Sequence, residues 1–223
     1  HGEVFDLNVK SALGSTISFP RASFQTDYVF MEFSDEAHLA RVLFFFTEWG
    51  SKFVEIKGMQ IDSGEAPLIQ FGDADFERVG KLRFQDIGTT HGNIGFDYVT
   101  FPKHGHTSFS FSDLGKGSVT FIQAHCANSI TFFQGPGRRF DAEFSLRGST
   151  FEGPLRIDGI RFGPVPSLIG TELRKHLDLS NVTFGVMMSE SDKKAEDDRG
   201  AKLQRLKELA EGNRDHNLAL KCH

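Results

Sequence analysis

Two histidines, His104 and His106, are the residues whose type and spacing best suit metal binding. They flank a single glycine, so both imidazoles could reach one ion, but a closed site needs further ligands to complete a set of about four. His91 and His125 could supply a further ligand only if the fold brought them close to this pair. No run of Cys or His lies nearby. We therefore interpret the pair as exposed loop histidines, and we expect neither a metal nor a cofactor.

The segment 135–139, Gly-Pro-Gly-Arg-Arg, is the clearest candidate for anion binding. Its backbone N–H groups and two guanidinium groups could face a phosphate, but the Lys-Ser/Thr ending of a P-loop is absent. We interpret the segment as a loop inserted where the chain turns a corner, between Phe132-Phe133 and Phe140. No Gly-rich turn opens a helix, so dinucleotide binding is unsupported.

Acidic residues offer the one pattern compatible with catalysis. Carboxylates are ligands that Ca²⁺ prefers, and some β-helical enzymes use acid clusters with a basic residue to cleave acidic polysaccharides. Acidic side chains are equally expected on any solvent-exposed face of a protein. The sequence shows no Ser-His-Asp or Cys-His pattern typical of nucleophilic catalysis. We therefore predict a protein without catalytic residues and keep a carbohydrate-active enzyme as an alternative. The acids concerned are Asp73, Asp75, Glu77, Asp86 and Asp97.

The composition favours enclosed packing of aromatic rings. The 223 residues include 24 Phe but only 2 Tyr and 1 Trp, and Phe carries no polar group that would suit a recognition surface. The net charge of −5 argues against a nucleic-acid partner. Two cysteines, Cys126 and Cys222, make no disulfide framework, which favours a reducing, cytoplasmic location, with Cys126 as a small buried hydrophobe. No apolar run reaches about 18 residues, so we expect this segment to make no membrane contact.

A short unit recurs along the chain, namely an apolar or small residue, one variable residue, and then Phe or Leu. Successive rings are often five residues apart, as in Phe71 to Phe76 and Phe96 to Phe101. This step matches neither the helical period of about 3.6 nor the strand period of about 2. It predicts a chain that turns a corner at each step, so that four sides close a coil of about twenty residues. Coils would then stack through parallel hydrogen bonds about 4.8 Å apart.

The stretches 74–78 (Ala-Asp-Phe-Glu-Arg) and 177–184 (Leu-Asp-Leu-Ser-Asn-Val-Thr-Phe) resemble the pentapeptide-repeat family. The resemblance covers residues 54–184 and 17–24, although many units carry Thr, Arg, Gly or Ser in place of Asp or Asn, as in a divergent member. It implies a mainly β fold, a right-handed quadrilateral β-helix whose central Phe or Leu points inward. The expected core ladder comprises Phe71, Phe76, Phe84, Phe96, Phe101, Phe111, Phe121, Phe132, Phe144, Phe162 and Phe184.

An interruption at residues 34–49 divides the repeat, and its pattern predicts a helix. Ser34 can cap its first turn, and Leu39, Val42, Leu43 and Phe46 fall on one face at helical spacing. We expect this helix to plug the N-terminal mouth of a solenoid that spans residues 1–188, because the first coil has an open edge.

The tail, residues 189–223, begins with a charged segment at 189–199 that favours a linker or a solvated helix start. A helix at 202–211 and a second from about residue 213 or 215 would form a hairpin. Similar helical tails follow the repeats in some bacterial pentapeptide-repeat proteins. The apolar face of the tail is the expected contact for a protein partner or for a homo-oligomer, and it comprises Leu203, Leu206, Ala210 and Leu218.

These observations favour a non-catalytic protein-binding or scaffolding solenoid. One alternative, motivated by the tail, is a cytoplasmic regulatory domain of a larger, channel-like membrane protein. The rival fold is an all-β sandwich or barrel, which short strands at intervals of about 8–12 residues would also suit. The five-residue steps, which a sandwich does not require, favour the solenoid.

Overall fold

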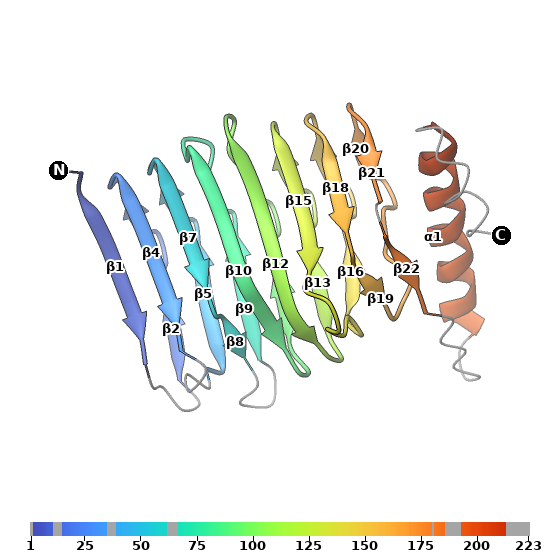
Figure 1. Cartoon of the computed structure of the whole chain (residues 1–223), viewed down its shortest axis with the longest axis horizontal. Helices are drawn as coiled ribbons and strands as arrows, with labels where there is room; N and C mark the ends of the chain where they lie inside the picture. Colours follow the sequence, from blue (N-terminus) through green and yellow to red (C-terminus); the bar gives the residue numbers. More distant parts are fainter. Residues whose placement is uncertain are drawn as a thin grey trace.

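The computed structural model describes residues 2–10, 15–34, 39–61, 67–179, 181–185 and 193–212, with the side chains of the terminal helix described from residue 199. These residues form short β-strands and one helix, α1 (Lys193–Gly212). Every described strand pair is parallel, which excludes the antiparallel sandwich. In Figure 1 the strands nearer the viewer run downward and the chain returns upward behind them, while successive turns advance from left to right. This path is that of a right-handed solenoid.

Each turn of the solenoid has one long side, which we call sheet A. Its strands follow one another in chain order from turn to turn, with β8 (Gln60–Ile61) joined to β10 at one end. They are β1 (Val4–Val9), β4 (Tyr28–Phe33), β7 (Phe53–Lys57), β10 (Lys81–Thr89), β12 (His106–Leu114), β15 (Ser129–Gln134), β18 (Leu155–Asp158) and β21 (Leu177–Asp178).

Three shorter sides complete each turn. Sheet B comprises β2 (Thr16–Ser18), β5 (Arg41–Phe45), β9 (Leu68–Gly72), β11 (Asn93–Gly95), β13 (Ser118–Thr120) and β16 (Glu143–Ser145). Sheet C comprises β3 (Ser23–Phe24), β6 (Glu48–Trp49), β14 (His125–Cys126), β17 (Thr150–Phe151) and β20 (Glu172–Leu173), with single bridges at Asp75 and Thr100 joining its two parts. A narrow fourth side follows sheet A and includes β19 (Arg161–Phe162) and β22 (Thr183–Phe184).

The turns are longer than the five-residue step predicts. Partners in sheet A lie between 22 residues apart, as Leu155 and Leu177 do, and 28 apart, as Phe53 and Lys81 do. The expectation of about twenty residues is therefore wrong, because sheet A strands are longer than one side of a regular pentapeptide coil.

The five-residue step does mark the corner between sheets B and C. Phe71 and Phe76 point into the core from either side of it, and so do Phe96 and Phe101. At this corner, one residue of each turn has a left-handed φ. Its N–H donates to the carbonyl of the residue that precedes the corner residue of the following turn. The N–H of Tyr98, for example, donates to the carbonyl of Ile122 at 2.8 Å. The corner ladder comprises Arg21, Phe46, Asp73, Tyr98, Gln123, Gly148 and Gly170.

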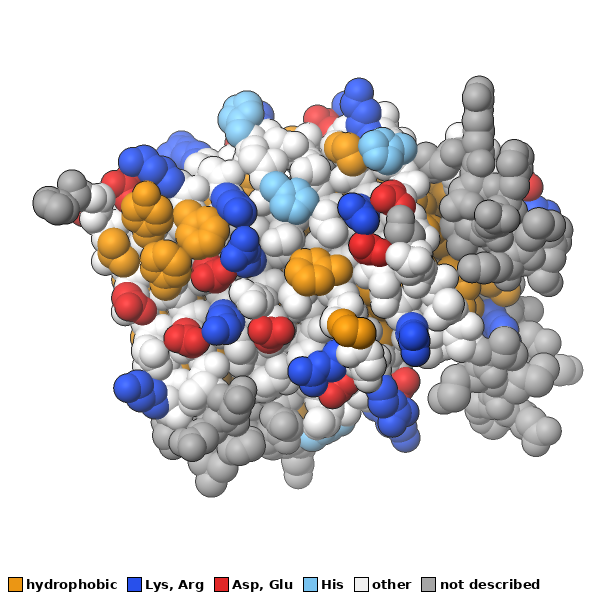
Figure 2. Space-filling view, in the orientation of Figure 1, with side chains coloured by type: hydrophobic (Ala, Val, Ile, Leu, Met, Phe, Trp, Pro, Cys, Tyr) orange, Lys and Arg blue, Asp and Glu red, His pale blue; other side chains and the backbone are white. Residues whose placement is uncertain are grey.

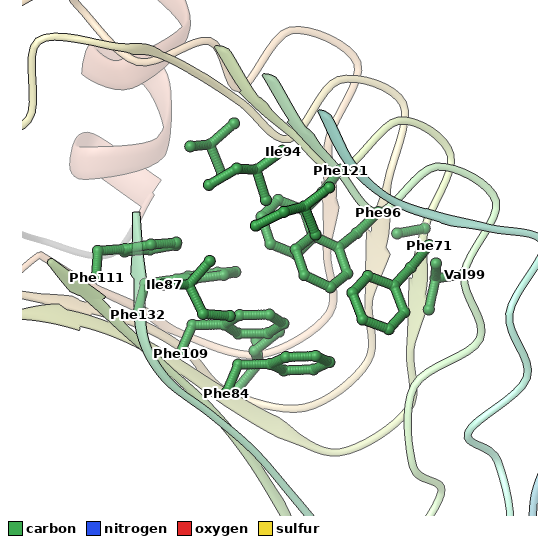
Figure 3. Packing of buried hydrophobic residues seen from close by; sticks show 14 of the residues in the cluster. Phe71, Phe84, Ile87, Ile94, Phe96, Val99, Phe109, Phe111, Phe121 and Phe132 are labelled. Atoms are coloured by element: carbon green, nitrogen blue, oxygen red, sulfur yellow. The ribbon is translucent and has the colours of Figure 1, made fainter. Parts of the chain in front are cut away.

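The interior is filled by stacked aromatic rings in more than one column (Figure 3). In the column from sheet B, neighbouring rings of Phe71, Phe96 and Phe121 lie 4.9 and 4.8 Å apart and are nearly parallel. In the column from sheet A, Phe109 stacks on Phe84 at 4.7 Å. The centroid spacing equals the spacing of parallel strands, about 4.8 Å, so each ring packs on its counterpart one turn away.

The rings of the expected ladder line this interior. Phe71, Phe76, Phe84, Phe96, Phe101, Phe111, Phe121, Phe132, Phe144 and Phe162 are at most 2% exposed, and Phe184, in the last turn, is half-buried. They do not form one column, because they come from different sides of the coil.

The helix predicted for residues 34–49 is wrong. Residues 41–45 form β5 and residues 48–49 form β6, while 35–38 lie outside the described residues. Val42 and Phe44 point inward and Arg41 points outward, which is a strand alternation. The hydroxyl of Ser34, the expected helix cap, donates to the carbonyl of Lys10 at 2.6 Å. Pairing of β5 with β2 and β9 on both edges outweighs the local helical spacing.

The C-terminal end of the solenoid is covered by α1 (Figure 1). The helix starts at Lys193, within the charged segment expected to be a linker or a solvated helix start, and the second expected helix lies outside the described residues. Leu206 is fully buried in the main core and Ala210 packs on Leu179 and Phe184. The helix therefore caps the last turn.

Candidate interaction face

The outer face of sheet A is a flat grid of side chains, because successive strand residues point to opposite faces. Parallel register sets the outward residues of neighbouring strands side by side. One row comprises Val4, Tyr28, Phe53, Lys81, His106 and Ser129, and the next comprises Asp6, Phe30, Glu55, Arg83, Ser108 and Thr131.

Apolar side chains gather at the N-terminal end of this face. We call Val4, Tyr28, Phe30 and Phe53 the aromatic patch, which lies with the orange residues at the upper left of Figure 2. The rings of Tyr28 and Phe30 are nearly parallel at 6.4 Å, and Phe30 lies 5.7 Å from Phe53. Val4 is 58% and Tyr28 40% exposed, so water contacts this cluster. Monomeric proteins seldom expose contiguous apolar surface without a use for it.

Cations border the patch on the next strand. The Lys81 ammonium lies 5.8 Å and the Arg83 guanidinium 5.9 Å from the centre of the Phe53 ring, within the range of cation–π attraction. Arg83 also pairs with Glu55 at 3.1 Å. Aromatic rings beside Arg are the composition that protein interfaces favour.

Toward the ends of the sheet A strands, the face deepens into a polar cleft of about 680 Å³. A smaller cavity of about 310 Å³ adjoins it, because Glu32 and Lys57 line both, and this cavity reaches Phe30 of the aromatic patch. Glu32 and Lys57 form an ion pair of 3.2 Å. The cleft is lined by Glu32, Phe33, Ser34, Lys57, Gly58, Gln60, Asp86, Ser112, Asp113 and Arg138.

Hydrogen bonds hold the cleft in shape. The Gln60 amide donates to the Ser112 hydroxyl at 2.6 Å and to the Asp86 carbonyl at 2.9 Å, which ties three turns together. The Arg138 guanidinium pairs with Asp113 at 3.3 Å. The cleft therefore offers fixed polar groups of both signs.

The histidine pair does not form a metal site. His104 is exposed in the turn before β12, and His106 begins β12, with its Nδ1 2.8 Å from the Ser129 hydroxyl. Partial burial and the nearby Lys81 lower the pKa of His106. Across the described residues, no group of three or more His, Cys, Asp or Glu is placed to hold a metal.

The basic segment 135–139 follows β15, and both of its arginines are already paired. Arg138 contacts Asp113, and Arg139 contacts Asp141 at 2.6 Å. The charge that a phosphate would need is thus partly neutralised.

The acids of the middle turns are engaged in several different contacts. Asp97 accepts hydrogen bonds from the Thr120 hydroxyl and the Ile122 N–H at the B–C corner. Glu77 pairs with Lys103, which lowers the pKa of that carboxyl. Asp73 lies on the corner ladder, Asp75 bridges in sheet C, and Asp86 lines the cleft. Within the part of the chain that the structure describes, these acids form no group of three or more that could hold a metal ion.

The three described contact residues expected in the tail pack against the chain's own solenoid. Leu206 and Ala210 are buried, Leu203 is partly buried against the core, and Leu218 lies outside the described residues. Arg205 donates to the Thr171 carbonyl at 2.7 Å and helps to hold α1 on the solenoid. In this arrangement the described tail residues cover the chain's own last turn.

Sequence reasoning missed the aromatic patch. It assigned Phe to the interior, whereas the stretch 28–33 interleaves an inward set, Val29, Met31 and Phe33, with the outward Tyr28 and Phe30. Strict alternation in this stretch was the available signal.

Comparison with known proteins adds no family to these observations. No protein-family model matches the chain, and no curated protein or solved structure matches it either. Across the described residues, no helix has both the length and the apolar character that crossing a bilayer requires. The fold defines the chain as a parallel β-solenoid with a helical cap.

Proposed function

We propose that this chain is a non-catalytic protein-binding module that uses the aromatic patch at the N-terminal end of the outer face of sheet A. The observation that carries the proposal is the exposed aromatic patch with Lys81 and Arg83 at its border. Such a patch supplies the aromatic anchors and the charged rim that give most of the binding energy and the specificity of protein interfaces.

The solenoid suits a scaffolding role because its face is held rigidly. Each strand of sheet A is hydrogen-bonded to the next, and inward residues such as Val29 and Ile56 are fully buried. A preorganised surface loses little conformational entropy on binding. A reducing, cytoplasmic setting fits this proposal, since Cys126 is a buried free thiol.

The chain is, in this proposal, a divergent relative of the pentapeptide-repeat proteins. The four-sided turns and the five-residue step at the B–C corner support the relation. The turn length of 22 to 28 residues is its main departure from the family pattern.

The test removes the outward rings and leaves the fold in place. In the variant Phe30→Thr/Phe53→Thr, Thr keeps the strand preference while deleting the aromatic anchors. Phe133→Thr is the matched control, since Phe133 is an outward Phe of β15 and is 40% exposed. Cross-linking in an extract of the source cells should identify a partner, and calorimetry with the purified partner should measure its affinity.

We expect the double variant to bind at least about 30-fold more weakly, as loss of a hot spot of about 2 kcal/mol implies. The Phe133→Thr protein should bind like the unaltered chain. Equal affinities for the double variant and the unaltered chain would contradict the proposal.

A further inference from the structure

A small cavity of about 290 Å³ lies where the chain leaves sheet A in its later turns. Residues 134–138 at the end of β15, Gly159 and Arg161 of the next turn, and Asn181 of the turn after that line it. Two of the lining side chains are cationic and none is acidic, whereas the cleft beside the aromatic patch carries charges of both signs. The cavity therefore favours an anion, although the whole chain has a net charge of −5.

Arg161 brings a second guanidinium group to the one that the basic segment supplies. It reaches the cavity because Phe133 pairs with Asp158, so the residues after β15 and those after β18 run side by side. Arg161 is exposed, and within the described chain its guanidinium has no hydrogen-bond or ion-pair partner. Arg138 pairs with Asp113 at 3.3 Å, but both side chains are more than half exposed, and water weakens such pairs. Both guanidinium groups are thus available to a more highly charged anion.

The loop after β15 also offers a backbone donor in a fixed shape. Gly137 has φ 79°, a left-handed conformation that glycine adopts without strain, and within the described residues its N–H has no acceptor. Turns of this kind present N–H groups that form anion-binding concavities. The loop is held closed because the Gln134 amide donates to the Arg139 carbonyl at 3.0 Å, and the Arg139 N–H donates to Asp113 at 2.9 Å. Its donors are therefore positioned before a ligand arrives.

Asn181 adds a donor from the third turn. Its side-chain amide donates to the Asp158 carboxylate at 3.3 Å, which leaves one of its two amide hydrogens for a ligand. Asp158 itself is paired with Arg156 at 2.9 Å, so its charge is partly neutralised at the border of the cavity. The donors around the cavity are thus two guanidinium groups, one backbone N–H and one amide.

We infer that this cavity binds a phosphate dianion, either free phosphate or the phosphoryl group of a small molecule. The planar fork of arginine can bond two phosphate oxygens at once. The volume lies just below the range of about 300–1,000 Å³ that is typical of pockets for drug-sized ligands, so it suits a single phosphate group. The cavity belongs to the turns of β15, β18 and β21, whereas the aromatic patch lies on β1, β4 and β7. Phosphate binding therefore does not depend on the proposed protein partner.

Isothermal titration calorimetry with potassium phosphate measures the affinity, at about pH 8, where the dianion predominates. Potassium chloride keeps the ionic strength constant. We expect a dissociation constant of about 1 mM or tighter. Arg161→Gln removes the charge but keeps a polar side chain, and it should weaken binding about 10-fold or more, as loss of a charge-assisted hydrogen bond implies.

The matched control is Arg147→Gln. Arg147 is also an exposed arginine, but it lies at the B–C corner, so this variant should bind phosphate like the unaltered chain. Thermal melts in phosphate-free buffer should coincide for both variants and the unaltered chain, which separates lost binding from lost folding. The Phe30→Thr/Phe53→Thr variant should also bind phosphate normally, so failure of the protein-binding proposal would leave this result intact.

Amide NMR spectra locate the bound ion. The Gly137 amide should shift as phosphate is added, whereas the amide of Gly148, a left-handed glycine of the B–C corner, should not. Glycerol phosphate distinguishes the two sources. Equal or tighter binding of the ester would support a phosphorylated small molecule as the ligand, and weaker binding would support free phosphate.

Two results would overturn the inference. One is the absence of both heat and a Gly137 shift at about 10 mM phosphate. The other is phosphate binding that Arg161→Gln leaves unchanged.

Discussion

Replacing Phe109 with alanine removes a ring at the centre of the aromatic interior. Phe109 is fully buried on β12, stacked on Phe84 at 4.7 Å and on Phe132 at 5.2 Å. Phe96 and Phe121 meet it edge-on from sheet B at 5.0 and 5.2 Å (Figure 3). Each of these neighbours is held in place by its own turn, so the surroundings cannot collapse into the space.

Truncation of a buried Phe to Ala costs about 3–5 kcal/mol, with the cost rising as the residual cavity grows. We expect Phe109→Ala to lower the free energy of unfolding by about 4–5 kcal/mol, since rings enclose the site on every side. Phe109→Leu, which keeps most of the volume, should cost about 1–2 kcal/mol and remains measurable if the Ala variant does not fold.

Guanidinium chloride unfolding followed by far-ultraviolet circular dichroism gives these free energies. The single Trp, Trp49 in β6, adds a fluorescence signal from the N-terminal turns. Because each turn contacts mainly its neighbours, a weakened middle should uncouple the two halves. We therefore expect the two signals to coincide in the unaltered chain and to separate in Phe109→Ala.

The matched control is Phe184→Ala in the last turn. Phe184 is half-buried and lies 6.4 Å from Phe162, so we expect a loss of about 1–2 kcal/mol. A cost for Phe109→Ala below about 2 kcal/mol, or one equal to that of Phe184→Ala, would refute the picture of a rigid, ring-filled interior.

Three further outcomes follow from individual residues. Tyr98 has φ 59° and is 56% exposed. Tyr98→Gly should raise the free energy of unfolding by about 1 kcal/mol in the same assay, because glycine relieves the strain of the left-handed backbone. A loss of stability would show that the ring makes a needed contact. Burial raises the pKa of Cys126 to about 12. In a Cys222→Ser variant, where Cys126 is the remaining thiol, a thiol reagent at about pH 8 should therefore label the chain only after denaturation. Fast labelling of the native protein would contradict this expectation. The ion pair with Lys103 lowers the pKa of Glu77, so the charged carboxylate stabilises the fold at neutral pH. Glu77→Gln should therefore lower the free energy of unfolding at neutral pH, and this loss should vanish as the pH falls well below 4.5, the ordinary pKa of Glu. A loss that does not depend on pH would count against the ion pair.

Local pattern was enough to predict a parallel coil rather than a sandwich. Phe71 and Phe76, and Phe96 and Phe101, are five residues apart because one tight corner lies between them, and a corner is a local feature of the chain. The length of a turn was not predictable in the same way, since it depends on how far sheet A continues before the chain bends.

The segment 39–49 shows where local pattern failed. Leu39, Val42 and Phe46 are spaced for one face of a helix, yet residues 41–45 also alternate as a strand. Both readings are locally acceptable, and hydrogen bonding to β2 and β9 selects the strand. Those partners come from other turns, so no window of sequence around the segment contains them.

The sequence by itself determined which residues could line an interior and where the chain must bend, because both follow from side-chain chemistry and backbone geometry over a few residues. Only the stacking of turns decided which rings are covered. Phe30 and Phe84 are the same residue type, but the first faces water on sheet A and the second faces the core. Tertiary contact makes that difference, since burial depends on which neighbouring turns occupy each side of a strand.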